Sequence, residues 1–297
     1  MNYLYSLFIF SIIARVMNNI SVCTIYAKRK NHLQNLVESL IDSKMQPDEL
    51  IIVCMDDKIP QLPVTPFKIK STNIQTKNDC LPLAEARNKA AKIAQSDNLI
   101  FLDVDCICSN NLVDIFHDHL SQENALYQGS ARYLLANWQQ HNWTLSSLFQ
   151  QSVPNLLQGA ELKENQKVNH PHELFWSLCF GIKRETFFSL NGFDSQYLGY
   201  GGEDTDFAFT VRSHNIPCYK ISALAYHQYH FSYDPPLNHL TDIVKNARIF
   251  YAKWHMLPMK KWLFKFSEMG YVKMKNNQID IIRYPTKAEI KACLKDC

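Results

Sequence analysis

Short apolar runs alternate with helix-like segments through the first hundred residues, and this alternation constrains the fold more than any other feature of the chain. Continuous runs of branched and apolar residues are typical of buried strands, which we expect at 20–26, 49–55 and 98–102, with a shorter one near 67–70. Between them, apolar residues recur at helical spacing from Leu33 to Ile41, and five alanines favour a helix over 84–94. Strands that alternate with helices in this way predict an α/β fold with a parallel sheet.

The second half of the chain has a different pattern. Residues 137–172 are rich in Asn, Gln and His and are expected to form a loop-rich insertion. Beyond it we expect a strand within 175–182, a helix at 204–213 and a late strand at 221–229, followed from about Leu240 by a tail with two helical stretches.

Composition narrows the class of protein. A chain of 297 residues that is 46% hydrophobic can build a substantial core. Its 31 basic and 28 acidic residues leave a net charge of only +3, which argues against a nucleic-acid partner. The nine cysteines are an odd number scattered through apolar runs, which suggests reduced, buried thiols and a cytoplasmic location.

The first 17 residues are treated separately, as an apolar N-terminal extension. The run at 3–14 is shorter than the roughly 18 residues that a membrane-spanning helix needs, and no basic residue precedes it. We expect the folded domain to begin near Met17, and a weak membrane anchor is the alternative.

Acidic residues follow two of the expected strands. Asp56 comes directly after the second strand, and Asp103 and Asp105 follow the run at 98–102. On an extended segment both carboxylates of D-x-D would point to the same side, where a divalent cation bound to a diphosphate would neutralise them. A solvated turn is the alternative. Cys106 and Cys108, which adjoin the pair, are expected to be packing residues rather than metal ligands.

Two further groups of residues suggest chemistry. The segment 200–206 sets three carboxylates beside two glycines, a pattern suited to a ligand-binding loop with a general base. It is equally suited to a helix N-terminus. His227 and His230 close the late apolar run, and spacing alone does not rank them as metal ligands.

Three blocks together resemble a known family. FLDVDC at 101–106, NGFDSQYLGYGGEDTDFAF at 191–209 and AYHQ at 225–228 look like an inverting GT-A glycosyltransferase of family 2. The GGED block is similar to that of β-1,4-galactosyltransferases and bacterial chondroitin polymerase. This resemblance implies a Rossmann-like, mixed, mostly parallel sheet flanked by helices, in a single domain with a helical C-terminal tail. The implied divisions are a domain at 18–235, with a nucleotide-binding half at 18–110 and an acceptor half at 170–235, and an extension at 236–297.

The resemblance also implies residues that bind the donor and a metal ion. Asp103, Asp105 and His227 match the ligands of Mn²⁺ (or Mg²⁺), and Asp103 also lies near the donor ribose. Asp56 matches the aspartate that reads uracil. Basic residues near the donor nucleotide are matched by Arg29, within AKRK, and by Arg87.

The resemblance of the GGED block implies which residues bind the acceptor. Asp204 matches the catalytic base, and Glu203 matches the neighbour that holds the acceptor sugar and assists catalysis. Tyr200 and Gly202 belong to the same acceptor-binding loop, and Tyr200 stands where galactosyltransferases have tryptophan.

The implied function is metal-dependent transfer of a hexose or N-acetylhexosamine from a UDP-sugar to a glycan or lipid-linked glycan. The alternatives are a nucleotidyltransferase and a non-catalytic carbohydrate-binding protein; the former would want a glycine-rich phosphate loop, which residues 27–31 lack. The tail mixes lysines with aromatic residues, which is typical of a packed terminal helix with a solvated face. Peripheral contact with the inner face of a membrane is the alternative.

Overall fold

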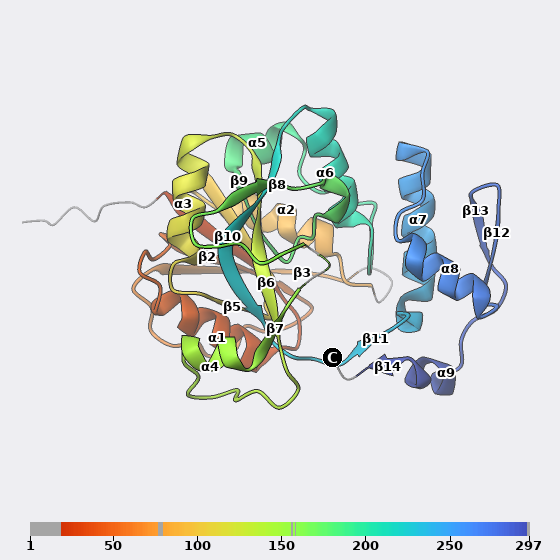
Figure 1. The fold of residues 1–297 in the computed structure, drawn as a ribbon, viewed down its shortest axis with the longest axis horizontal. Coiled ribbons are helices and arrows are strands. Elements are labelled where there is room, and N and C mark those ends of the chain that lie inside the picture. Colours follow the sequence, from red (N-terminus) through yellow and green to blue (C-terminus); the bar gives the residue numbers. More distant parts are fainter. Residues whose placement is uncertain (1–18, 77–79, 156, 158, 296–297) are drawn as a thin grey trace, which may run out of the picture.

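A ten-stranded mixed sheet forms the centre of the molecule in the computed structural model, which describes residues 19–76, 80–155, 157 and 159–295 (Figure 1). Its main strands are β1 (Ile20–Tyr26), β2 (Glu49–Met55), β3 (Lys68–Ile74), β4 (Asn98–Leu102), β5 (Cys106–Cys108), β6 (Leu126–Leu134), β9 (Cys179–Lys183) and β10 (Cys218–His227). They lie in the order β3-β2-β1-β4-β9-β6-β10-β5, with the short strands β7 (Ser152–Pro154) and β8 (Lys167–Asn169) paired to β6 and β10.

The directions of the strands confirm the predicted sheet. Strands β3, β2, β1 and β4 are mutually parallel, as are β6 and β10. Strand β9 runs antiparallel between β4 and β6, and β5 runs antiparallel to β10. The expected strands at 20–26, 49–55 and 98–102 coincide with β1, β2 and β4, because each is a continuous apolar run buried on both faces.

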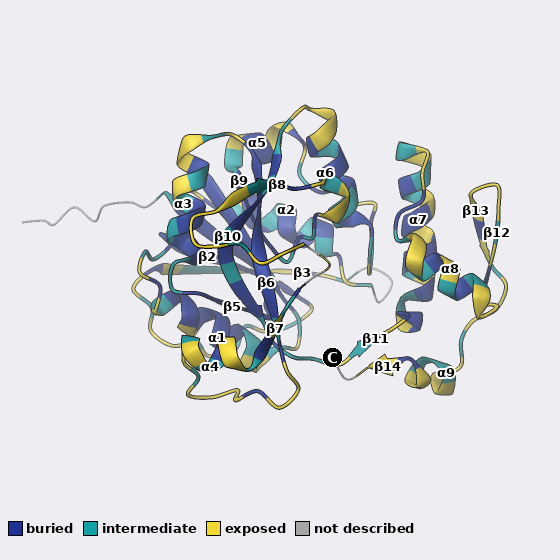
Figure 2. Cartoon of the chain, viewed as in Figure 1, coloured by how far each residue is buried: buried dark blue, intermediate teal, exposed yellow. Residues whose placement is uncertain are grey.

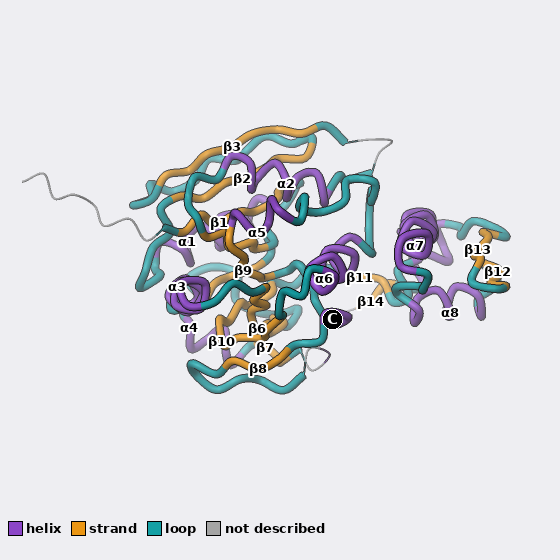
Figure 3. Tube along the Cα trace, turned by 90° about the horizontal axis from the view of Figure 1, so that it is seen from above, coloured by secondary structure: helices purple, strands orange, loops and turns teal. Residues whose placement is uncertain are grey.

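Helices cover both faces of the sheet (Figure 3). Helices α1 (Lys30–Ile41) and α3 (Leu112–Gln122) pack on one face, and α2 (Leu83–Ile93), α5 (Arg184–Ser189) and α6 (Glu203–Ser213) pack on the other. Buried residues follow the sheet and the inner sides of these helices, and the outer sides are exposed (Figure 2). The described residues of 137–172 are mostly irregular, as expected, and include α4 (Leu145–Gln150), β7, β8 and the start of the short 3₁₀ helix η2 (His172–Leu174).

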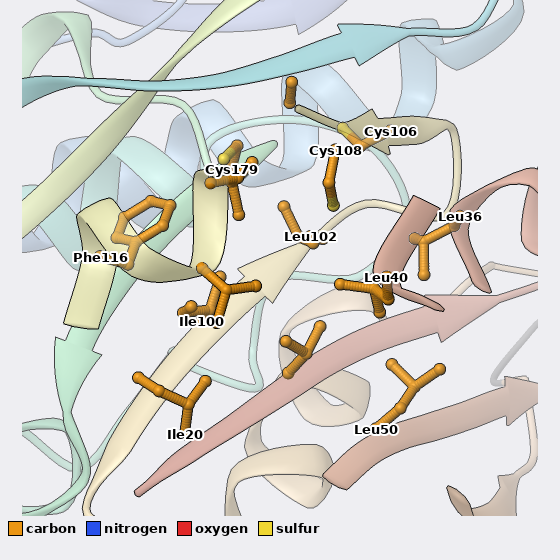
Figure 4. Packing of buried hydrophobic residues seen from close by; sticks show 14 of the residues in the cluster. Ile20, Leu36, Leu40, Leu50, Ile100, Leu102, Cys106, Cys108, Phe116 and Cys179 are labelled. Atoms are coloured by element: carbon orange, nitrogen blue, oxygen red, sulfur yellow. The ribbon is translucent and has the colours of Figure 1, made fainter. Parts of the chain in front are cut away.

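The cysteines near the D-x-D motif lie in the core, which confirms their packing role. Cys106, Cys108 and Cys179 gather beside Phe116 and Leu102 (Figure 4). Burial raises the pKa of Cys108 to about 12 and that of Cys106 well above its ordinary value, so both stay as thiols. All the cysteines in the described part of the chain are free.

The C-terminal tail is helical as predicted and also contains strands that the sequence did not reveal. Its elements are β11 (Ser232–Tyr233), η3 (Leu237–His239), α7 (Leu240–Trp254), α8 (Lys260–Glu268), the hairpin β12 (Val272–Lys275) and β13 (Gln278–Ile281), α9 (Lys287–Ala292) and β14 (Leu294–Lys295). They share an apolar cluster of their own. Figure 1 shows this body beside the sheet, with α7 nearest to α6.

No helix among the described residues has both the length and the apolar character needed to cross a membrane. The expected apolar extension at 1–17 lies outside the described residues.

Candidate functional site

The D-x-D motif lies in a turn, which corrects one expectation. Strand β4 ends at Leu102, and the chain turns before β5, with the Cys106 amide donating to the Asp103 carbonyl at 2.9 Å. The segment is therefore not extended through Asp105, and the inference that alternation puts both carboxylates on one side was wrong. Instead, Asp103 and Asp105 take different partners.

Asp105 faces two histidines, one at the end of β10 and one in the chain just after it. Strands β5 and β10 pair so that Cys106 lies opposite His227, which brings the histidine beside Asp105. Asp105 Oδ2 lies 3.6 Å from His227 Nε2 and 3.3 Å from His230 Nε2. The three residues offer one ligand atom each within 4.8 Å of one another. His230 is the functional candidate that sequence reasoning left unranked, because only the fold shows that the chain after β10 curls back to Asp105.

This donor set fits a divalent cation. A carboxylate oxygen with two imidazole nitrogens suits Mn²⁺ better than Mg²⁺, which prefers oxygen ligands throughout. Burial lowers the pKa of His227 to about 4, despite the opposing charge of Asp105, so the ring is neutral and can donate a lone pair to a metal. Asp103, two residues before Asp105, is not one of these three residues, and its carboxylate pairs with Arg87.

Arg29 forms an ion pair with Asp105 on the same oxygen that faces the histidines. It is the residue just before α1, in the loop after β1, so its position follows from the parallel order of β1 and β4. Burial alone would raise the pKa of Asp105, but the facing histidines and Arg29 hold it well below its ordinary value. Arg29 therefore neutralises a carboxylate that a cation would otherwise neutralise.

Arg87 links the D-x-D motif to the glycine-flanked loop. It projects from α2 with its side chain only 5% exposed, and Nη2 lies 3.0 Å from Asp103 Oδ1 while Nη1 lies 3.3 Å from Glu203 Oε1. Asp103 lies just after β4, and Glu203 lies at the start of α6. Two motifs separated by about a hundred residues thus form one site.

Glu203 and Asp204 begin α6, so the helix predicted from 204 starts one residue earlier. Gly202, just before it, has a φ of 93°, a conformation that favours glycine. Burial and the charge of Asp204 raise the pKa of Glu203 to about 7, and burial also raises the pKa of Asp204. A carboxylate pair with raised pKa values, of which Glu203 is buried and Asp204 half-buried, is suited to general acid–base chemistry.

Tyr200 lies against both the acidic loop and the C-terminal tail. Burial, followed by the charges of Glu203 and Asp204, raises the pKa of Tyr200 to about 12, so its hydroxyl stays protonated beside the carboxylates. Its ring stacks on His239 at 4.7 Å and tilts against Trp262 at 5.7 Å.

Asp56 stands apart from these residues. It follows β2, which neighbours β1, and its carboxylate accepts hydrogen bonds from the amide and the hydroxyl of Thr76 after β3. These hydrogen bonds hold the pKa of the exposed Asp56 below its ordinary value. Asp56 therefore also lies beyond the carboxyl end of a parallel strand, but its hydrogen-bond partner is Thr76.

Comparisons with known proteins identify the family of the chain. A family model described as glycosyltransferase-like family 2 matches residues 21–235, more than half of the chain. No curated protein matches the chain significantly.

Solved structures give the fold. One similar structure is GalNAc-T7 with UDP, GalNAc and Mn²⁺, with a TM-score of 0.51 and 15% identity over 71% of this chain and 44% of that chain. Another is residues 1–349 of TarS from S. aureus, with a TM-score of 0.51 and 13% identity over 84% of this chain and 73% of that chain. The chain thus spans less than half the length of the GalNAc-T7 chain. At these identities the likeness establishes the GT-A fold alone.

Proposed function

The chain belongs to glycosyltransferase-like family 2, and from that premise we propose a metal-dependent, inverting enzyme that moves a hexose or N-acetylhexosamine from a UDP-sugar to a hydroxyl of a glycan or glycolipid. One observation carries the proposal: the Arg87 guanidinium joins Asp103 of the D-x-D motif to Glu203 of the GGED loop, so donor-side and acceptor-side residues share one site.

On the donor side, Asp105, His227 and His230 would hold the cation, with Asp103 beside them. A divalent ion bound there would neutralise the diphosphate leaving group. Arg29 and Arg87 supply further positive charge near that group, and Asp56 is assigned to the uracil edge. The structural neighbour with UDP, GalNAc and Mn²⁺ supports a nucleotide sugar and a metal of this kind. In this proposal residues 18–110 form the nucleotide-binding half.

On the acceptor side, residues 170–235 supply the chemistry. The acceptor hydroxyl oxygen attacks the anomeric carbon, the bond from that carbon to the diphosphate oxygen breaks, and the hydroxyl proton passes to Asp204. Glu203, Tyr200 and Gly202, at and before the start of α6, would hold the acceptor sugar in this proposal. A single displacement inverts the anomeric configuration, and a positioned base of this kind contributes about 10²- to 10⁴-fold to the rate.

The C-terminal body suggests where the acceptor is encountered. Helix α8 exposes Phe264, at 55% of its surface, among the lysines of its sequence KKWLFKFSE. Exposed aromatic and basic residues favour anionic membrane surfaces, so we propose peripheral membrane contact. The free cysteines support a cytoplasmic location in this proposal. Replacing Phe264 with Glu should then reduce sedimentation with anionic vesicles, and unchanged sedimentation would contradict the membrane contact.

A panel of UDP-sugars tests the proposed reaction. Purified protein is assayed for UDP release and for glycan product with Mn²⁺, with Mg²⁺ and with a chelator, and Asp105→Ala is assayed in parallel. The proposal predicts release that requires the metal and is lost in Asp105→Ala, together with a β-linked product from an α-linked donor. Retained anomeric configuration, or release indifferent to metal and to Asp105, would contradict it. Donor binding without any turnover would favour a non-catalytic carbohydrate-binding protein.

A further inference from the structure

The loop before the acidic pair is conformationally free, because half of its residues are glycine. It runs from Tyr197 to Gly202 and contains three glycines with φ values of 70°, 92° and 93° at 199, 201 and 202. Backbone in this conformation is accessible to glycine without strain, but glycine also adds conformational freedom to a loop. The direction of Glu203 and Asp204 therefore depends on contacts from elsewhere.

Those contacts come from α7, in the C-terminal body, which lies alongside α6 in two views (Figures 1 and 3). Asn246, in the middle of α7, is fully buried, and its Nδ2 donates to the carbonyls of Leu198 at 3.0 Å and Gly201 at 2.8 Å, with the Tyr200 carbonyl at 3.4 Å. One amide group thus binds the carbonyl groups on both sides of the loop's turn.

An asparagine at position 246 lowers the stability of the fold relative to an apolar residue, which indicates that its hydrogen bonds to the loop have a function. Asparagine is a poor helix former, and its Oδ1 has no hydrogen-bond partner among the described residues. An unpartnered buried oxygen costs free energy that an apolar residue would not. The neighbours Ile243 and Ala247 on the same helix are buried and apolar, so a leucine would suit the surroundings better if packing alone decided the residue.

A second contact lies one helical turn earlier. The Tyr200 amide donates to Asp242 Oδ2 at 3.4 Å, and Gly199 packs so closely on Asp242 that a Cβ atom there would overlap its carboxylate. Gly201 packs on Met259, whose Sδ would lie 2.6 Å from an added Cβ. The glycines of the loop are therefore matched to the surface of the C-terminal body.

A third contact fixes the start of α6 itself. Asp206, which is 1% exposed, accepts from Trp254 Nε1 at 2.7 Å and from Lys253 Nζ at 2.9 Å, both at the end of α7. The loop and the first turn of α6 are thus both bound to α7, and none of these α7 groups is bonded to Glu203 or Asp204.

We propose that Asn246 is a positioning residue that holds the 197–202 loop so that Glu203 and Asp204 face Arg87, and that α7 is therefore part of the acceptor side of the site. The proposal rests on the function proposed above for these carboxylates. It predicts that loss of the Asn246 amide group disturbs use of the acceptor sugar. Binding of the UDP-sugar should stay intact, because the residues around Asp105 belong to the central sheet and the loops that follow its strands.

Two variants disrupt the contact between α7 and the 197–202 loop, one on each side of it. Asn246→Asp keeps the shape and removes the donor, and Gly199→Ala pushes the loop away from Asp242. Arg248→Ala is the matched control, because Arg248 lies on the same helix but bonds to Ile279 and Asp280 within the C-terminal body.

Hydrogen exchange followed by mass spectrometry measures the loop without any need for activity. We expect faster exchange over 198–204 in both variants, with exchange in β1 and β4 unchanged, and no such change in Arg248→Ala. In transfer assays we expect kcat to fall about 10²-fold with a higher acceptor KM, as for a small displacement of reacting groups, while the Kd for UDP with Mn²⁺ stays constant.

Unchanged loop exchange in both variants would overturn the proposal, and so would an equal loss of UDP binding and turnover. A wild-type protein that transfers no sugar would instead refute the proposed function, and the exchange result would still decide whether α7 holds the loop.

Discussion

Arg87 and Glu203, 116 residues apart in the sequence, form an ion pair of 3.3 Å in the interior of the protein. The same guanidinium binds Asp103 at 3.0 Å, so it compensates a carboxylate on each side of the proposed site. Removing it would leave buried negative charges without a partner.

Arg87→Met should therefore destabilise the fold strongly. Loss of one partner from a buried ion pair costs about 3–5 kcal/mol, and we expect about 3 kcal/mol here because Asp103 is partly exposed. Urea unfolding measures the change. Lys265→Met, which breaks the part-exposed pair with Asp234, is the control and should cost less than about 1 kcal/mol. Equal effects in the two variants would show that the Arg87 network is not buried as described.

His230→Ala should weaken metal binding although no motif in the sequence distinguishes His230. Its imidazole supplies one of the three ligand atoms around Asp105. Changes around metal ligands reduce affinity by about 10- to 100-fold, and we expect a loss of at least this order for Mn²⁺, measured by electron paramagnetic resonance titration. His117→Ala, on α3, is the control and should bind Mn²⁺ as the wild type does. Wild-type affinity in His230→Ala would remove this residue from the site.

Arg29→Met should have opposite effects on metal and nucleotide. Arg29 and a cation both draw on the charge of Asp105, so without nucleotide the variant should bind Mn²⁺ more tightly. The same variant should bind UDP more weakly, since positive charge near the diphosphate is lost. Calorimetric titration with each ligand measures both effects. Weaker binding of Mn²⁺ in Arg29→Met would mean that Arg29 supports the metal site rather than competing with the metal.

Activity should fall on acidification at a higher pH than it would with an ordinary exposed aspartate as the base. The proposed base must be ionised. Burial and the charge of Asp204 raise the pKa of Glu203 to about 7, and burial raises the pKa of Asp204 above its ordinary value. Protonation of this pair therefore begins at a higher pH than for exposed carboxylates. Glu203→Gln removes one negative charge, so the pKa of Asp204 should fall and the acidic limb of the kcat/KM profile should move to lower pH. A limb that stays in place or moves upward would contradict this coupling.

The central sheet could be predicted from sequence because its signals are local. β1, β2 and β4 are uninterrupted apolar runs, and the acidic start of α6 follows two glycines. In contrast, the antiparallel insertion of β9 between β4 and β6 depends on pairing between distant segments, which apolar pattern does not specify.

For the candidate site, the structure shows where the predicted residues lie, and the sequence did not indicate how they are arranged. Asp105 and His227 do lie together, but the turn after Leu102 sends Asp103 to Arg87, because β4 ends before the motif. The positions of His230 and Asn246 were not predicted from the sequence. Each is an ordinary polar residue in sequence, and its role depends on a contact made across the fold.

The most direct test of the account is one preparation of Asp204→Asn, measured for both binding and turnover. Titration with a UDP-sugar and Mn²⁺ should give the wild-type Kd, whereas transfer to the acceptor should fall by at least about 10²-fold, as expected when a general base is lost. Transfer at the wild-type rate would contradict the assignment of Asp204, and with it the claim that the GGED loop and the Asp105 cluster form a single catalytic site.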